Sequence, residues 1–143
     1  MDWYRIKHTI RMCFIGSGTG RAKYLKKHNV FFNMGDGCMT MFRKIPLYPK
    51  LISFGDNVWI ASNVSFLTHD VIHQMINQRE ERALLKEHVG CIKIKDNVFI
   101  GANTTILSDT IIGPNAIIGA GSLVNKDVCG GYMPGFQLDI YVQ

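Results

Sequence analysis

The 143-residue sequence has no apolar run that approaches the roughly 20 residues needed to span a membrane. Near the N-terminus the longest apolar run, residues 12–15, is also too short for the apolar core of a secretory signal. We therefore expect a cytoplasmic protein with no membrane span.

Cysteine is scarce and scattered. The four cysteines form no Cys-x-x-Cys pair, so neither a disulfide framework nor a zinc knuckle is predicted. Acidic residues are almost missing from residues 1–50, which hold ten Lys and Arg against Asp2 and Asp36. Such a stretch attracts phosphate groups, although a solvated basic face is an equally good interpretation. We expect no nucleic-acid partner, because no recognised binding motif accompanies the charge.

What the sequence does contain is a repeat with a period of six. An aliphatic residue returns at Ile94, Ile100, Ile106, Ile112, Ile118 and Val124. In an extended chain residues two apart share a face, so the small or β-branched residue two positions earlier also points inward. Gly, Asn, Asp and Pro crowd the positions between, where the chain must turn. The period predicts a triangular parallel β-helix with three short strands per coil.

The same rhythm appears earlier as FGDNVW, IASNVS and FLTHDV, with Phe54, Ile60 and Phe66 inside. Another unit begins at Met34, twenty residues before Phe54, so two extra residues must be absorbed near Pro46–Pro49. Between Phe66 and Ile94 the rhythm breaks, which predicts a loop over about residues 70–92. One domain is expected, with an N-terminal extension (1–33), coils (34–128) and a C-terminal tail (129–143).

Outward positions of the repeat are also apolar. Phe99 should stack over Ile117 and Thr105 over Leu123, since each pair is one coil apart. Exposed apolar stripes favour packing against other subunits. Alternatively, the N-terminal segment, with Trp3, Ile6, Ile10 and Cys13 at helical spacing, covers one of them.

The run IKIKDNVFIGANTTILSDTIIGPNAIIGAGSLVNKDV resembles the last coils of the hexapeptide-repeat acetyltransferases. The likeness extends over about residues 50–128 and is strongest to the branch with maltose, galactoside, xenobiotic and capsular-polysaccharide acetyltransferases. This resemblance implies an all-β, left-handed parallel β-helix that assembles as a homotrimer, with active sites between subunits. It also implies acetyl transfer from acetyl-CoA, here to a hydroxyl of a saccharide or glycan precursor, with no metal.

The resemblance further implies roles for single residues. His69 takes the place of the general base, a role that suits imidazole at neutral pH. Asp70 and His73 would border the acceptor. The positions matched to acetyl-CoA binding are Ala61, Phe99, Ala102, Ala120 and Lys126.

Three alternatives remain open from the sequence. The acceptor could be an amine on an amino sugar rather than a hydroxyl. A metal enzyme like the γ-carbonic anhydrases, which share the fold, would have His69, His73 and His88 available as ligands. A trimeric scaffold without catalysis is the third.

Overall fold

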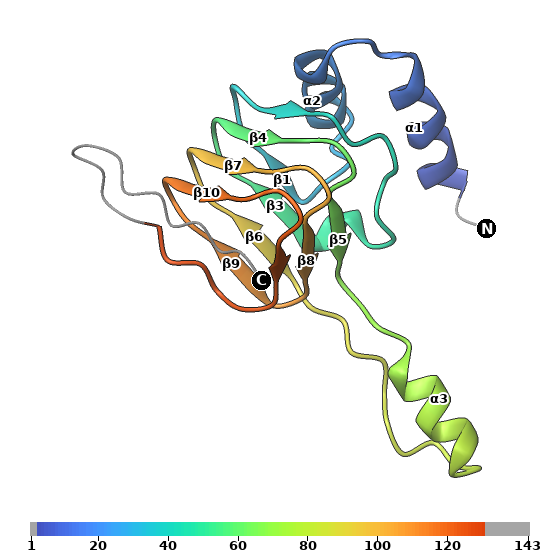
Figure 1. Ribbon diagram of the computed structural model, residues 1–143. Helices are drawn as coiled ribbons and strands as arrows, with labels where there is room; N and C mark the ends of the chain where they lie inside the picture. Colours follow the sequence, from blue (N-terminus) through green and yellow to red (C-terminus); the bar gives the residue numbers. More distant parts are fainter. Residues whose placement is uncertain (1–2, 131–143) are drawn as a thin grey trace.

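The computed structural model describes residues 3–130, whose strands stack into three parallel sheets (Figure 1). One sheet is ordered β1-β3-β6-β9 (Asn33–Met34, Ile52–Phe54, Ile92–Ile94, Thr110–Ile112). The second is ordered β10-β7-β4-β2 (Ala116–Ile118, Val98–Ile100, Val58–Ile60, Met39–Thr40). The third is ordered β11-β8-β5 (Leu123–Val124, Thr105–Leu107, Ser65–Leu67). The chain visits the sheets in turn, which agrees with the predicted β-helix.

The pairing register follows the repeat. Phe99 pairs with Ile117 and Thr105 with Leu123, as the period predicted. Met34 pairs with Phe54, so the first coil does contain two extra residues. A 3-10 turn, η1 (Pro49–Leu51), lies in the segment where the sequence required them to be absorbed.

The expectation of an all-β chain was incomplete, because three helices accompany the coils. They are α1 (Trp3–Phe14), α2 (Gly18–Lys27) and α3 (Ile72–Arg79). The first two form the N-terminal extension, and α3 lies in the predicted loop, away from the stacked strands (Figure 1). No helix within residues 3–130 is both long and apolar enough to cross a bilayer.

Corners of the coil are set by asparagine. Asn57, Asn97 and Asn115 all adopt positive φ, between 54° and 58°, a conformation that Asn tolerates better than most residues. Their side chains form a ladder, with Asn57 Nδ2 donating to Asn97 Oδ1 and Asn97 Nδ2 to Asn115 Oδ1, both at 3.0 Å. Gly101 has a different reason to be glycine, since a Cβ there would lie 2.4 Å from the Ala120 nitrogen. The turn residues therefore serve both backbone angle and close stacking.

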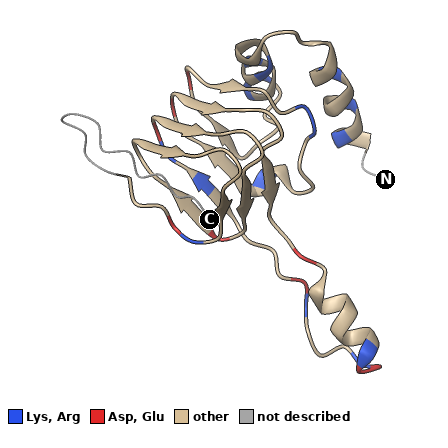
Figure 2. Cartoon of the chain, in the orientation of Figure 1, with Lys and Arg blue, Asp and Glu red and all other residues tan. Residues whose placement is uncertain are grey.

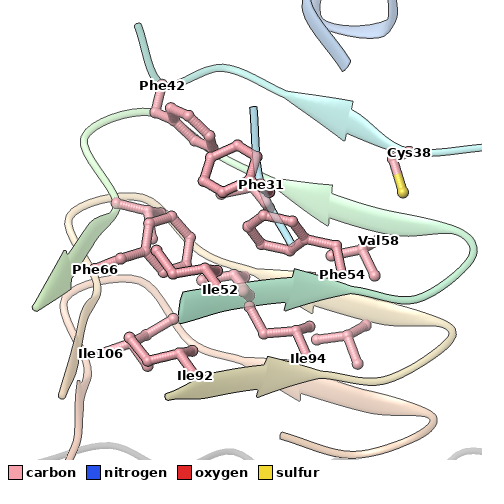
Figure 3. Close-up of a cluster of buried hydrophobic side chains, with 14 of the residues drawn as sticks. Phe31, Cys38, Phe42, Ile52, Phe54, Val58, Phe66, Ile92, Ile94 and Ile106 are labelled. Atoms are coloured by element: carbon pink, nitrogen blue, oxygen red, sulfur yellow. The ribbon is translucent and has the colours of Figure 1, made fainter. Parts of the chain in front are cut away.

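The interior is a column of aromatic and aliphatic side chains (Figure 3). Toward the N-terminal coils Phe31, Phe42, Phe54 and Phe66 pack edge to face, with ring centroids 4.9–6.1 Å apart. Beyond them the inward isoleucines of the repeat are fully buried. Fully burying one such side chain stabilises the fold by about 1.5–3 kcal/mol.

Helix α2 packs against β1 and β2 at the end of the coil, and the N-terminal helices leave the outward stripes uncovered. Trp3, Ile10 and Cys13, the alternative cover considered for one stripe, are exposed, and Met12 faces the core instead. Helical spacing alone identified a helix here and selected the wrong face. Phe99, Ile111 and Leu123 stay 36–48% exposed.

Arg21 fastens α2 to the first coil. Its side chain is fully buried, and its guanidinium donates to the carbonyls of Ile15 (2.6 Å) and Thr40 (2.9 Å). Burial, followed by the nearby charge of Arg43, lowers the pKa of Arg21. Carbonyl acceptors compensate in part for the cost of burying the cation.

Candidate active site

His69 lies at the corner where β5 ends and the long loop begins. Its backbone forms an isolated antiparallel bridge with Val89, and the Gly90 N–H donates to the Thr68 carbonyl at 2.8 Å. The two ends of the loop are therefore joined beside His69. This backbone closure fixes the histidine on a rigid coil rather than on the mobile part of a loop.

The His69 ring is half-buried and packs edge-on against Tyr48, with ring centroids 5.2 Å apart. Its Nδ1 is buried and has no hydrogen-bond partner within residues 3–130. This leaves Nε2 as the ring nitrogen that can face a substrate. A base requires such an accessible nitrogen.

Neighbouring carboxylates are engaged elsewhere. Asp70 Oδ1 accepts the Ile72 N–H at 3.0 Å and so begins α3. Glu87 Oε1 accepts the Tyr48 hydroxyl at 3.3 Å, and the negative charge of Glu87 is the main cause that raises the pKa of Tyr48. Glu87 therefore reaches His69 only through the Tyr48 ring.

His73 is on α3, half-buried, and its Nδ1 also has no partner in the part of the chain that is described. It does not line the cleft beside His69. Asp70 and His73 thus follow His69 closely along the chain, at the start of the loop, but no hydrogen bond joins the three side chains.

A cleft of about 200 Å³ opens beside His69. It lies between α1, the segment 44–47 and β5, and is lined by Arg5, Lys44, Ile45, Pro46, Leu47, Val64, Ser65, Phe66, Leu67 and His69. Arg5 and Lys44 come from segments that sequence reasoning did not connect to the site. No local sequence pattern identifies these two residues, because they precede His69 by 64 and 25 residues along the chain.

The alanines matched to acetyl-CoA lie at a different corner, where the chain passes from β4, β7 or β10 to the next strand. Ala102 and Ala120 are in register there, one coil apart, since Ile100 pairs with Ile118. Ala61 is one position earlier in its corner, and its N–H donates to the Ile100 carbonyl at 2.9 Å. Of these three alanines, only Ala102 and Ala120 have a backbone N–H with no backbone acceptor within residues 3–130.

Phe99 is on the outward face of β7, between Trp59 on β4 and Ile117 on β10. These three side chains line a shallow hollow together with Asn57, Asn97 and Val98. Lys126 is exposed, after β11, on the last described coil.

The predicted site residues thus form two groups that one chain does not bring together. His69 follows the sheet of β5, whereas Ala102 and Ala120 precede that sheet. A three-residue strand of roughly 10 Å separates these corners.

Within residues 3–130 no three His, Cys, Asp or Glu side chains gather closely enough to hold a metal ion. His88, one of the histidines considered as a ligand, instead lies with Nε2 2.8 Å from Asp109 Oδ2 and ties the end of the loop to the coil.

Known proteins share this architecture and its repeat. Residues 91–126 match the family described as "Bacterial transferase hexapeptide (six repeats)". The Bacillus subtilis protein named "Putative acetyltransferase YvoF" is 35% identical over 113 residues, which are 76% of this chain and 59% of that protein. A maltose O-acetyltransferase from Clostridium difficile 630 superposes with a TM-score of 0.65 at 25% identity, covering 96% of this chain and 80% of the other.

Residues 91–126 thus carry the repeat of the bacterial hexapeptide transferases, and the chain as a whole is similar in sequence and fold to hexapeptide-repeat acetyltransferases. A hexapeptide-repeat acetyltransferase from Vibrio cholerae O1 biovar eltor, solved with acetyl-CoA, shares the fold, with a TM-score of 0.59 at 20% identity over 88% of this chain and 76% of that one. The chain spans 59% of the length of the Bacillus subtilis relative.

These matches confirm the resemblance noted in the sequence. The words that carried it, from IKIKDNVFIGAN to LVNKDV, span residues 92–128 and overlap the matched residues 91–126 except at the ends.

Proposed function

We propose that this chain is an acetyl-CoA-dependent O-acetyltransferase that acts on a hydroxyl of a saccharide or glycan precursor, with His69 as general base. The proposal is supported above all by one observation. A histidine borders a cleft at the corner where the long loop between β5 and β6 begins, and its buried Nδ1 leaves Nε2 as the ring nitrogen for a substrate.

The chemistry follows from the position of that nitrogen. His69 Nε2 accepts the proton of the acceptor hydroxyl as its oxygen attacks the carbonyl carbon of the thioester, and returns the proton to the leaving sulfur. Acetyl-CoA supplies the activated acetyl group. Negative charge that develops on the carbonyl oxygen needs N–H donors that are already oriented. The backbone N–H of Ala102 or Ala120 could serve as such a donor, because neither donates to another backbone group within residues 3–130.

We further propose a homotrimer in which each site is shared. His69 of one subunit would face the Ala102–Ala120 corner of its neighbour, which resolves their separation within one chain. Phe99 and Lys126 would contact the acetyl-CoA at that same interface. The stripe of Trp59, Phe99 and Ile117, exposed at the first two residues and half-buried at the third, supplies apolar surface for such contacts.

The proposal is tested by acetyl transfer from acetyl-CoA to a panel of neutral sugars, amino sugars and glycan fragments, with release of CoA thiol as the readout. His69→Ala should lower kcat by roughly a hundredfold or more, the usual contribution of a general base. His28→Ala is the matched control, because His28 is exposed at the C-terminal end of α2 and does not line the cleft. A fully active His69→Ala variant would reject His69 as the base.

A further inference from the structure

We propose that the acceptor site beside His69 selects a negatively charged sugar, one that carries a carboxylate or a phosphate group. This inference rests on the proposed function for the identity of the site. It depends on two cations, Arg5 and Lys44, which line the same cleft as His69.

Neither cation forms an ion pair within residues 3–130. The ion pairs in this part of the chain join Lys26 to Asp36, Arg79 to Glu80 and His88 to Asp109. Asp70 and Glu87, which belong to the loop that begins at His69, accept hydrogen bonds from the Ile72 N–H and the Tyr48 hydroxyl, and neither lines the cleft.

The Arg5 guanidinium is held in place along one edge, and its other edge is available to bind a ligand. Its Nε and Nη2 both donate to the Ile45 carbonyl, at 3.4 and 3.1 Å. Ile45 is in turn fixed to α1, since its N–H donates to the Thr9 hydroxyl at 3.3 Å. A guanidinium has five N–H donors, so the outer pair on Nη1 and Nη2 remains available for a carboxylate or phosphate.

Charge on the surrounding surface strengthens this selectivity. Residues 3–35 contain no Asp or Glu, and Figure 2 shows blue but no red segments on the ribbons of α1 and α2. A cleft lined by one sign of charge concentrates ligands of the opposite sign. Neutral sugars gain nothing from this field.

None of the residues matched to acetyl-CoA lines this cleft, neither Ala61 and Phe99 nor Ala102, Ala120 and Lys126. Ala102, Ala120 and Lys126, matched to acetyl-CoA, belong to the last coils, whereas Arg5 and Lys44 lie at the first coil. Figure 1 shows α1 at the opposite end of the stack from β10. The cationic cleft is therefore assigned to the acceptor.

The test uses three sugars that differ only at carbon 6: methyl galactoside, methyl galacturonide and methyl galactoside 6-phosphate. Dissociation constants are measured by ligand-observed NMR titration, and acetyl transfer is followed in parallel. The full chain is compared with Arg5→Gln, Lys44→Gln and the double variant. Lys23→Gln is the matched control, because Lys23 is exposed on α2 and lies outside the cleft.

We expect at least one anionic sugar to bind roughly tenfold more tightly than the galactoside, the equivalent of one well-placed charge pair. Whichever anion is preferred identifies the group as carboxylate or phosphate. Each single variant should reduce the preference and the double variant should abolish it, whereas Lys23→Gln should retain it.

Equal binding of all three sugars, no saturable binding of either anionic sugar, or a preference that survives in the double variant would overturn the inference. The Lys44 side chain forms no hydrogen bond or ion pair within residues 3–130, so loss of fold in Lys44→Gln cannot imitate the result. Failure of acetyl transfer to every sugar, with the binding preference intact, would instead reject the proposed function.

Discussion

Substitution of Asn97 tests how the coil is held together. This residue combines a φ of 58° with two side-chain hydrogen bonds, one to Asn57 and one to Asn115. Alanine loses both bonds and must also adopt a left-handed conformation. Glycine loses the same bonds and adopts that conformation freely.

The magnitudes can be worked out from these contacts. An alanine in the left-handed region costs about 1–2 kcal/mol. Each exposed hydrogen bond contributes roughly 0.5 kcal/mol, the low end of the usual range. Asn97→Ala should therefore lower the free energy of unfolding by about 2–3 kcal/mol. Asn97→Gly should lose about 1–2 kcal/mol, since the flexibility of glycine in the unfolded chain adds to the lost bonds.

Asn125 is the matched control, because it is exposed and is not among the residues with positive φ. There the order should reverse, with glycine about 0.5–1 kcal/mol less stable than alanine. The assay is urea unfolding followed by circular dichroism at one fixed protomer concentration, since subunit association changes apparent stability. If Asn97→Gly proved no more stable than Asn97→Ala, backbone angle would not be what selects asparagine at this corner.

Three further predictions concern single side chains. Burial, then the charges of His28 and Lys7, lowers the pKa of His8, so the unfolded chain binds a proton that the folded chain resists. The free energy of unfolding should be at its full value above about pH 6.5 and decrease as the pH falls below it. In His8→Gln the urea midpoint of unfolding should change less between pH 7.5 and 5.5 than in the unmodified chain. Tyr48→Leu should reduce kcat by roughly tenfold or more, because His69 loses the ring that positions it. Tyr48→Phe keeps the ring and should retain most of the kcat of the unmodified chain. An equal loss of kcat in both variants would show that the hydroxyl matters instead. Gly101→Ala should lower the free energy of unfolding, measured by thermal denaturation, by about 1–3 kcal/mol, because its Cβ would clash with the Ala120 backbone. The same clash should weaken acetyl-CoA binding measured by calorimetry. Unchanged stability and binding would contradict the close stacking of these two corners.

The stacked coils were predictable from the sequence because each unit repeats a local rule. An inward aliphatic every six residues, with Asn or Gly at the corners, determines both the strand positions and the register, as the pairing of Phe99 with Ile117 shows. The break between Phe66 and Ile94 located the loop for the same reason. Its helix, α3, was not predicted, because eight residues without a buried side chain carry little periodic signal.

The N-terminal extension was less predictable. His8 is only 4% exposed, and its Nδ1 lies 2.8 Å from the Tyr24 hydroxyl. Which face of α1 turns inward depends on α2 and on the coil end beneath, and neither is encoded in the spacing of α1 itself. Arg5 joins the cleft by the same long-range packing.

The candidate site divides in a similar way. Local pattern and resemblance located His69 and the alanine corners separately. Their separation across a strand of one coil is a property of the folded chain, and it makes a second subunit part of the proposal.

Complementation between two inactive variants tests this central claim most directly. His69→Ala removes the base, and Ala102→Trp obstructs the acetyl-CoA corner. Each homotrimer should be inactive. Trimers reassembled from an equal mixture should regain about a quarter of the wild-type acetyl-transfer rate, because each interface receives its histidine and its alanine corner from different chains. Activity of the mixture no greater than the sum of the two parents would contradict a site shared between subunits.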